Sequence, residues 1–338
     1  MLEAELNGAG MPRDARKAKA MKRRAFVKTT ALGAAAVALQ GAPSQAAAAK
    51  MPLRSYGRDG VRLSIIGFPG LVLRNMEQER ANRLVADSVE RGVNYFDVAP
   101  AYGDAEVKLG PALEPYRKNV FLACKTKARD AEGAEVEFKR SLARLRTDHF
   151  DLYQLHCLKE VGRDVDAAFS EGGVMAFIAD QQKAGRVKYV GFTAHTEEAA
   201  LAALERFRFD SVLFPISFAS WMKMDFGPKV VKAARARGTA VLAMKGLCRN
   251  RWTKDDPLRK RFRMWYRPVH DRGEATLALR FTLSQAVVAA VPPSNETVHR
   301  LALDLAPTIR PITEAETAKL QALAQTLNPL FPERPRNA

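Results

Sequence analysis

The sequence is poor in cysteine, with three residues among 338. So few cysteines exclude a disulfide-stabilised scaffold, and the spacing of Cys124, Cys157 and Cys248 matches no metal or iron–sulfur motif, so we expect no metal site. No apolar run reaches about 18 residues, which predicts a mature protein without a stable membrane anchor. Neither Gly-x-Gly-x-x-Gly nor Gly-x4-Gly-Lys-Ser/Thr occurs, which argues against a doubly wound nucleotide-binding fold and a P-loop enzyme.

What is present is a globular, basic composition. Hydrophobic residues make up 47% and charged residues 27%, a balance that excludes disorder over most of the chain. The net charge is +17, and residues 1–50 carry +6 of it because nine Lys and Arg there face three acids. The remaining +11 favours an anionic ligand, nucleic acid or an acidic surface as a partner.

The N-terminus has the layout of an export signal. A basic segment at 22–28 contains paired arginines, a weak apolar run follows at 31–39, and Ala46–Ala49 form a small-residue cleavage site. Paired arginines before a weak apolar run resemble a twin-arginine signal, whereas a disordered basic tail would need no such order. We predict a signal peptide with an N-terminal extension over 1–50, recognised by the twin-arginine translocation machinery and cleaved near Ala46–Ala49.

The predicted mature domain, 51–338, would then be periplasmic or exported. Because twin-arginine export carries folded proteins, this route is typical of a chain that binds a cofactor before export. The first 20 residues add nothing to the signal, so Met1, Met11 and Met21 all remain candidate starts.

From residue 63 onward, short β-rich apolar runs alternate with amphipathic stretches of helical period. The predicted strands lie at 63–67, 93–97, 120–125, 150–156, 187–192, 211–215, 240–245 and 287–291. The predicted helices lie at 77–91, 104–115, 133–145, 165–184, 196–206, 226–238, 273–285 and 295–305. Eight such pairs predict an α/β fold, a (β/α)8 TIM barrel, with an N-terminal hairpin at 53–64 and an extra C-terminal helix at 314–326.

Four titratable residues fall at or near the ends of three consecutive predicted strands. Strand two ends in Asp97 with Tyr102 five residues later, strand three ends in Lys125, and strand four ends in His156. The C-terminal strand ends of such barrels form the active site. A buried salt bridge and a core histidine would explain any one of these residues, but not all four together. A lysine beside a phenol lowers the phenol's pKa, so the pattern predicts Tyr102 as a general acid.

At these positions the chain resembles the aldo-keto reductase family. Residues 94–103 read Asn-Tyr-Phe-Asp-Val-Ala-Pro-Ala-Tyr-Gly, close to the family's Asp-Thr-Ala-x-x-Tyr-Gly. Residues 122–125 match the strand with the family's catalytic lysine, and 151–156 match the segment with its catalytic histidine. The similarity extends from about residue 53 to about residue 305, and a divergent branch with Gly-Phe-Ser/Thr-x-His and Met-Lys is the most similar.

The resemblance implies an enzyme that reduces a small-molecule carbonyl, an aldehyde or ketone, by hydride transfer from NADPH, with NADH as the alternative donor. Tyr102 would protonate the developing alkoxide. Lys125 and Asp97 would tune Tyr102, and His156 would orient the substrate oxygen. A donor already aimed at the oxygen where charge develops stabilises the transition state more than the ground state.

The cofactor positions depart from the family pattern. Thr193-Ala194-His195 stands where the family has Ser-Asn, Phe214 replaces a strand-six glutamine, and Met244-Lys245 stands where an aromatic residue stacks on nicotinamide. The segment after strand eight lacks the usual Gly or Lys. The residues that the resemblance still assigns to the cofactor are Thr193, His195, Met244, Lys245, Ser294, Asn295 and Arg300.

Several of these residues have a second interpretation. His195 could replace the lost amide contact or face solvent at a helix start, and Lys245 could meet a phosphate or the substrate, or form a rim salt bridge. Ser294 opens a helix, where capping and phosphate binding are compatible. Arg300 could bind a 2′-phosphate or lie on a solvated face.

Segment 249–272 is both basic and aromatic. Nine Lys and Arg there face three acids, and four aromatic residues interleave with them. The mixture is typical of a nucleic-acid surface, but the segment falls between strands seven and eight, at the expected mouth. We therefore predict a lid over a pyrophosphate or an anionic substrate, and no nucleic-acid partner. Cys124 and Cys157 adjoin the catalytic candidates, so strand alternation predicts buried, inert thiols in the helix layer.

Two rival functions stand beside the carbonyl reductase. The first is an exported barrel that has lost nicotinamide use and acts as a binding or scaffold protein for an anionic envelope ligand; the altered cofactor positions motivate it. The second is a basic protein that binds envelope polyanions, motivated by the +11 of the mature chain. The four catalytic candidates argue against the first of these, because a barrel without catalysis would not need them.

Overall fold

The computed structural model describes residues 50–57, 59–262 and 264–332. The predicted twin-arginine signal and its cleavage site at Ala46–Ala49 lie outside the described residues. Within the described part, no helix combines the length and apolar character needed to cross a membrane.

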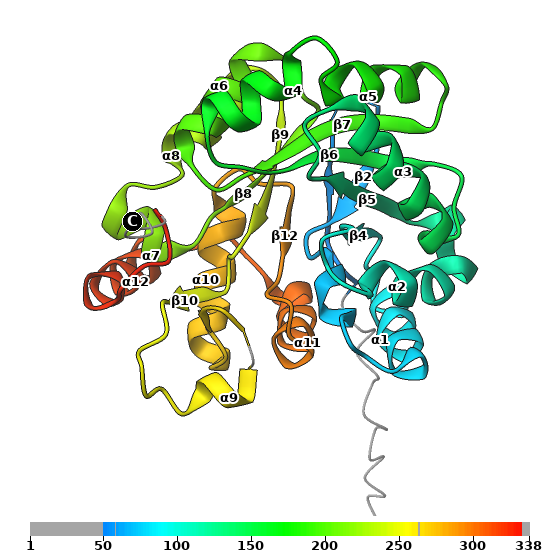
Figure 1. Ribbon diagram of the computed structural model, residues 1–338. Helices are drawn as coiled ribbons and strands as arrows, with labels where there is room; N and C mark the ends of the chain where they lie inside the picture. The colour runs from blue at the N-terminus through cyan, green and yellow to red at the C-terminus, as the bar shows by residue number, and fades with distance from the viewer. Residues whose placement is uncertain (1–49, 58, 263, 333–338) are drawn as a thin grey trace, which may run out of the picture. The chain divides into compact units, whose positions relative to one another are not determined.

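Eight parallel strands form a single sheet in the order β12-β9-β8-β7-β6-β5-β4-β3 (Figure 1). Its two ends meet, because Gly67 N donates to Ala290 O at 2.9 Å and Ala290 N donates to Ile65 O at 2.8 Å. The sheet is therefore a nearly closed barrel, and the predicted TIM barrel is confirmed. Its strands are β3 (Phe68–Pro69), β4 (Tyr95–Asp97), β5 (Phe121–Thr126), β6 (Phe150–Leu158), β7 (Val187–Ala194), β8 (Ser211–Pro215), β9 (Ala240–Met244) and β12 (Ala289–Val291).

Helices surround the barrel in alternation with the strands (Figure 1). Side-chain caps mark where several begin: Asp130 accepts from Gly133 N at 2.7 Å, and Thr196 and Asp271 cap later helices. The helices that match predicted ones are α1 (Gln78–Glu90), α2 (Ala105–Leu113), α3 (Ala131–Leu145), α5 (Val174–Lys183), α6 (Glu197–Arg206), α8 (Pro228–Ala236), α10 (Arg272–Ser284) and α11 (Glu296–Leu305).

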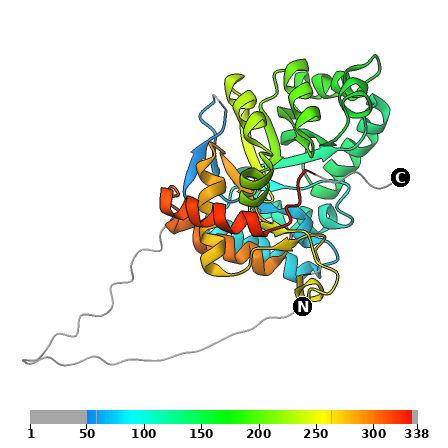
Figure 2. The same ribbon diagram turned by 90° about the vertical axis from the view of Figure 1, so that its left-hand side faces the viewer.

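The predicted C-terminal helix is α12 (Glu314–Thr326), and it begins at a capping box. It packs beside α10 and α7 (Phe218–Met224), as Figure 2 shows. Lys223 binds the C-terminal end of α12 by donating to the carbonyls of Gln325 at 2.8 Å and Leu327 at 2.6 Å. The sequence did not predict α7, because seven residues are too few to show a helical period.

The first predicted strand, 63–67, is wrong in its placement. Residues Arg62–Ser64 form β2, which pairs with β1 (Leu53–Ser55) in the predicted hairpin, and the barrel strand β3 starts only at Phe68. Apolar residues occur on both sides of Ser64 with no break long enough to mark a turn, so periodicity could not separate the two strands. Gly67 lies between them, where a Cβ atom would come within 2.6 Å of the Tyr95 ring.

The predicted helix at 165–184 is interrupted. A π-helical turn η3 (Val161–Asp166) runs into the short α4 (Ala167–Phe169), and α5 starts only after Gly172 and Gly173. Gly172 has a φ of +72°, a conformation that ends a helix. The two glycines therefore override the apolar pattern.

Aromatic rings close the barrel at its N-terminal end. Tyr56 from the hairpin packs edge-on against Phe121 and Tyr189, with ring centroids 5.1 and 5.2 Å apart, and its hydroxyl bonds Ser211 Oγ at 3.0 Å. Tyr95 packs in the same cluster. Because this end is filled, the strand ends at the opposite mouth are where a ligand can enter.

Candidate active site

The structure brings Asp97, Tyr102, Lys125 and His156 together at this mouth. Lys125 Nζ lies 2.5 Å from Asp97 Oδ1 and also donates to the Val98 carbonyl at 3.0 Å. The ammonium is 5.4 Å from the centre of the Tyr102 ring, and that ring meets His156 edge-on with 5.7 Å between centroids. Neighbouring parallel strands β4, β5 and β6 carry three of these residues, and Tyr102 lies on the loop after β4.

Two further residues hold the Asp97 carboxylate. Tyr95 donates its hydroxyl and Gln154 its amide to Asp97 Oδ2, each at 3.2 Å. We did not predict Gln154, although strand alternation could have indicated it. Residues 152, 154 and 156 share one face of their strand, and that face points into the barrel.

Burial sets the electrostatics of the three other groups. Burial raises the pKa of Tyr102, Lys125 lowers it, and the resulting pKa lies above the ordinary value. Burial lowers the pKa of Lys125, but Asp97 and Tyr102 raise it, and the balance lies above the usual range. Burial and the charge of Lys125 hold the pKa of His156 well below its usual range, so its imidazole is neutral at physiological pH.

The expected direction for Tyr102 is therefore wrong. The prediction counted the nearby ammonium and left out the loss of hydration, which outweighs it here. A phenol with a raised pKa stays protonated at neutral pH. Tyr102 is thus a hydrogen-bond donor at the mouth at any ordinary pH.

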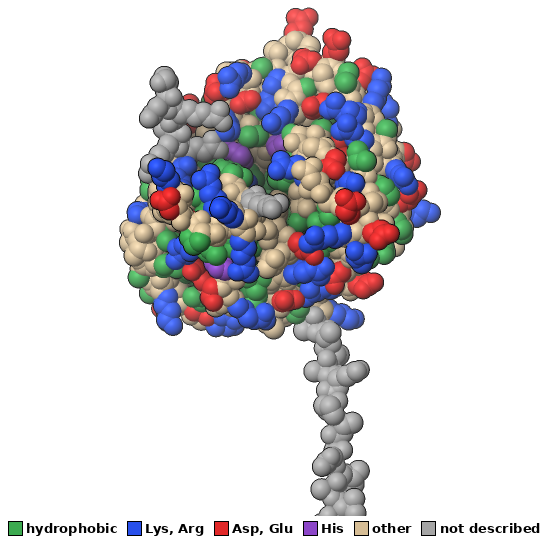
Figure 3. Space-filling view, turned by 60° about the horizontal axis from the view of Figure 1, so that its bottom comes forward, with side chains coloured by type: hydrophobic (Ala, Val, Ile, Leu, Met, Phe, Trp, Pro, Cys, Tyr) green, Lys and Arg blue, Asp and Glu red, His purple; other side chains and the backbone are tan. Residues whose placement is uncertain are grey.

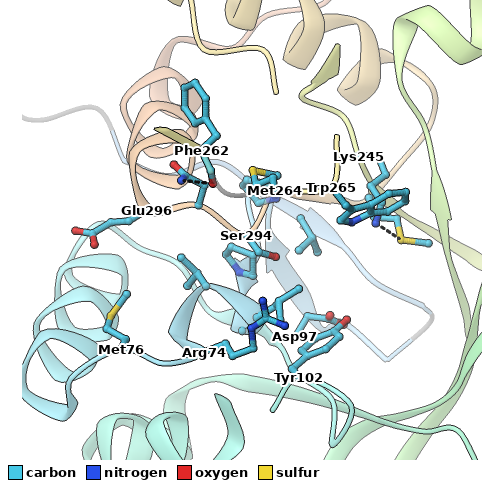
Figure 4. A pocket seen from close by; sticks show the side chains of 18 of the residues that line it. Arg74, Met76, Asp97, Tyr102, Lys245, Phe262, Met264, Trp265, Ser294 and Glu296 are labelled. Atoms are coloured by element: carbon cyan, nitrogen blue, oxygen red, sulfur yellow. Dashed lines mark hydrogen bonds between the residues drawn. The ribbon is translucent and has the colours of Figure 1, made fainter. Parts of the chain in front are cut away.

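A cavity of about 840 Å³ opens beside Tyr102. Figure 3 looks onto this face, which is hollowed near its centre and carries Lys and Arg side chains around the hollow. Its walls come from the segment after β3, the end of β9, the start of α11 and residues 261, 262 and 264–266. In Figure 4, Arg74, Asp97 and Tyr102 lie together at one side of the cavity, and Phe262 and Trp265 lie across from them.

Four of the predicted cofactor residues line this cavity. Met244 ends β9 and Lys245 directly follows it, and Ser294 and Asn295 precede α11. Asn295 caps α11 by accepting from the backbone of residue 298, and its amide donates to the Phe262 carbonyl at 3.3 Å. This bond joins the start of the helix to the opposite wall.

The segment predicted as a lid forms one wall of the cavity. Strands β10 (Cys248–Asn250) and β11 (Arg267–Pro268) pair antiparallel at its base, and the short α9 (Leu258–Phe262) lies between them. Trp252 Nε1 donates to the Met264 carbonyl at 2.7 Å and fixes the loop internally. The described residues 261, 262 and 264–266 of this segment line the cavity.

Three predicted cofactor residues have other partners. Thr193 Oγ1 accepts from Cys157 N at 2.6 Å, and His195 Nδ1 lies 3.5 Å from Cys157 Sγ. Arg300 forms ion pairs with Asp87 at 2.7 Å and with Glu296 at 3.1 Å. None of the three is among the described residues that line the cavity. Through these ion pairs Arg300 joins α1 and α11, and the suggested 2′-phosphate contact stays a prediction.

The cysteines behave differently from one another. Cys124 and Cys248 are 0% and 1% exposed, and burial raises the pKa of Cys248 to about 12, so both fit the expected inert thiols. Cys157 does not fit: it is half-buried, has a φ of +64°, and its thiol faces His195. The register between β6 and β7 breaks just there, so strand alternation no longer predicts the side-chain direction.

Comparison with known proteins gives one consistent result. A model of the Aldo/keto reductase family matches residues 66–325. D-galacturonate reductase of Fragaria ananassa is 23% identical over 82% of this chain and 92% of its own length. L-galactose dehydrogenase of Arabidopsis thaliana is 29% identical over 43% of this chain and 49% of its own length.

The similarity is partial for several relatives. The oxidoreductase YqkF of Bacillus subtilis is 32% identical, but the match covers 31% of this chain and 39% of the relative, so the chain spans less than half of it. The aldo-keto reductase AKR11C1 from Bacillus halodurans, in its holo form, superposes with a TM-score of 0.65 over 83% of this chain and 99% of its own, at 21% identity. That structural likeness supports the fold.

Replacing Lys125 by Met should destabilise the protein. Asp97 would remain buried as a charge without its ion-pair partner, and breaking a buried pair costs roughly 3–5 kcal/mol. Urea unfolding at pH 7, followed by tryptophan fluorescence, measures the loss. The double variant Asp97→Asn/Lys125→Met has neither of the two buried charges and should recover part of the stability. An unchanged unfolding midpoint in Lys125→Met would show that the pair contributes nothing.

Alkylation should discriminate between the three cysteines. In the folded protein at pH 8, iodoacetamide should modify Cys157 first, because its thiol is partly exposed while burial protects the other two. Peptide mass spectrometry over time measures the order, and urea-unfolded protein, where all three should react alike, is the control. Equal rates in the folded state would contradict the structure at Cys157.

Proposed function

The chain belongs to the aldo/keto reductase family, and on that premise we propose that it reduces an aldehyde or ketone to an alcohol, with NADPH as the hydride donor and Tyr102 as the general acid. The chain is an oxidoreductase by its family. The observation that carries the finer proposal is the phenol of Tyr102, which lines the cavity with the Lys125 ammonium behind its ring and His156 at its edge.

Tyr102 would act on the carbonyl oxygen. A bound nicotinamide supplies the hydride that arrives at the carbonyl carbon. As negative charge grows on the oxygen, Tyr102 donates first a hydrogen bond and then its proton, which stabilises the transition state more than the ground state. Its raised pKa keeps the proton on the phenol until that charge develops.

Lys125 and His156 support this transfer in different ways. The Lys125 ammonium stabilises the phenolate that is left after proton transfer, and Asp97 keeps that ammonium charged and in place. His156 is neutral, so it can donate a hydrogen bond to the substrate oxygen without competing for the proton. Each group therefore has one task.

The cavity suits a nicotinamide dinucleotide. Its volume of about 840 Å³ is in the range of ligand pockets, roughly 300–1,000 Å³. Met244 provides an apolar surface, and Ser294 and Asn295 stand at the start of a ten-residue helix, where backbone N–H groups favour phosphate. Lys245 adds a positive charge on the same side, which favours NADPH over NADH in this proposal.

A second candidate is a barrel that no longer uses nicotinamide and binds an anionic envelope ligand. One observation favours it: Thr193 and His195, which the family resemblance assigns to the nicotinamide amide, contact Cys157. The arrangement around Tyr102 argues for the reductase. Relatives named for L-galactose, D-galacturonate and 6-dehydroglucose support a sugar-like carbonyl compound as the substrate.

We also propose that the protein is exported. The pattern around Arg23 and Arg24 supports recognition by the twin-arginine machinery, cleavage near Ala46–Ala49 and a periplasmic or secreted mature protein. Such a route would deliver the barrel already folded around its nucleotide.

Replacing Tyr102 by Phe should abolish turnover and leave nucleotide binding intact. The ring remains, so NADPH should quench tryptophan fluorescence with the affinity of the wild type, in the micromolar range or tighter. Reduction of 4-nitrobenzaldehyde, followed by NADPH absorbance, should fall by roughly 10²–10⁴-fold, because a positioned acid contributes that much.

Three outcomes would count against the proposal. Undiminished turnover in Tyr102→Phe would place the acid elsewhere. The absence of a saturable signal with either NADPH or NADH would favour the binding protein. Tighter binding of NADH would overturn the NADPH assignment while the reductase proposal stands.

Exchanging both Arg23 and Arg24 for Lys should block export. The charge is kept, so only recognition of the arginine pair is lost. Fractionation of cells and an immunoblot should show the uncleaved chain in the cytoplasm, and the unchanged sequence should give the shorter, periplasmic form. If the double variant is found in the periplasm, another export route must operate.

A further inference from the structure

Among the residues that the structure describes, four cationic side chains line the cavity, and three of them have a partner. Arg80 Nη2 lies 2.7 Å from Glu296, the Lys245 ammonium lies 5.3 Å from the centre of the Trp265 ring, and the Arg261 guanidinium stacks on its own neighbour, residue 262. The fourth is Arg74. Among the residues that the structure describes, no hydrogen bond or ion pair engages its guanidinium.

Arg74 is held next to the candidate acid. Its backbone belongs to the turn that ends η1 (Gly70–Leu73), and the following residue is tied to Asp104 by a 2.8 Å bond. Its stem lies over Gly103, where a Cβ atom would come within 3.1 Å of Arg74 Cγ and Cδ. Gly103 directly follows Tyr102, and both Arg74 and Tyr102 line the same side of the cavity (Figure 4).

The carboxylates that line the cavity do not neutralise Arg74. Asp97 is paired with Lys125, and Glu296 is paired with Arg80 and Arg300. A positive charge is thus left over at the Tyr102 side of the cavity. The proposed phosphate contacts lie elsewhere, at the ends of β9 and β12, so this charge is placed for the substrate.

We propose that Arg74 binds a carboxylate of the substrate, and that the preferred substrates are aldehydes or ketones with a carboxylate a few bonds from the carbonyl. The inference rests on the proposed reductase function. A guanidinium binds a carboxylate through two parallel hydrogen bonds, which also fix its orientation. Met76, Phe262 and Met264 offer apolar surface for the carbon skeleton between the two groups.

The test compares an acid with its neutral ester. Wild type, Arg74→Gln, Arg74→Lys and Arg83→Gln are assayed with 4-carboxybenzaldehyde and with methyl 4-formylbenzoate. Arg83 is the matched control: it lies on α1, its side chain is 70% exposed and pairs with Glu79, and it is not among the described residues that line the cavity. We expect the acid-to-ester ratio of kcat/KM to fall roughly tenfold to a hundredfold in Arg74→Gln, as for the loss of a charge-assisted bond.

In Arg74→Gln the fall in kcat/KM for the acid should come mainly from a higher KM. Arg74→Lys should restore part of the acid-to-ester ratio, and Arg83→Gln should keep the wild-type ratio. The 2-, 3- and 4-carboxy isomers then measure the distance between the phenol and the guanidinium, since one isomer should show the largest effect. An unchanged ratio in Arg74→Gln overturns the proposal. So does a rise in KM for NADPH that is equal with both substrates, because Arg74 would then contact the nucleotide.

A calorimetric binding titration separates this proposal from the reductase proposal. If wild type turns over neither aldehyde, the reductase proposal fails. Tighter binding of the acid than of the ester, lost in Arg74→Gln, would still support the carboxylate site. Equal binding of acid and ester by wild type would overturn it, whatever the turnover.

Discussion

The ion pair between Lys125 and Asp97 is the constraint on which the rest of the site depends. Both side chains are almost fully buried, at 1% and 3% exposure, and removing two charges from water costs several kcal/mol unless each is well paired. The parallel register of β4 and β5 brings them to 2.5 Å, and Tyr95 and Gln154 supply further donors to the carboxylate. The closed barrel makes this arrangement rigid.

The position of this ion pair affects the pKa values of the neighbouring Tyr102 and His156 side chains. The ammonium behind the Tyr102 ring opposes the effect of burial on the phenol, and it also helps keep His156 neutral. The filled N-terminal end of the barrel leaves one open mouth, and segment 248–268 walls it on one side. Tyr102, Arg74 and the proposed cofactor contacts Met244, Lys245 and Ser294 line one cavity at this mouth.

Around Cys157 the molecule departs from regular barrel geometry. The register break between β6 and β7 and the positive φ turn the thiol toward His195, and Thr193 holds the backbone of Cys157. Residues that the family resemblance assigns to the nicotinamide thus serve a local cluster. In the proposed function the nucleotide would instead be bound by residues at the end of β9 and before α11, which line the cavity.

The sequence by itself determined the barrel, most of its helices and the four residues at the mouth, because strand and helix periods and the spacing from Asp97 to His156 are local properties. Only the tertiary structure decided the rest. The pairing of Arg300 with Asp87 and the direction of the Cys157 thiol toward His195 depend on side chains distant in the chain, as does the lack of a partner for Arg74 among the described residues. The net pKa of Tyr102 likewise depends on burial, which no spacing of residues records.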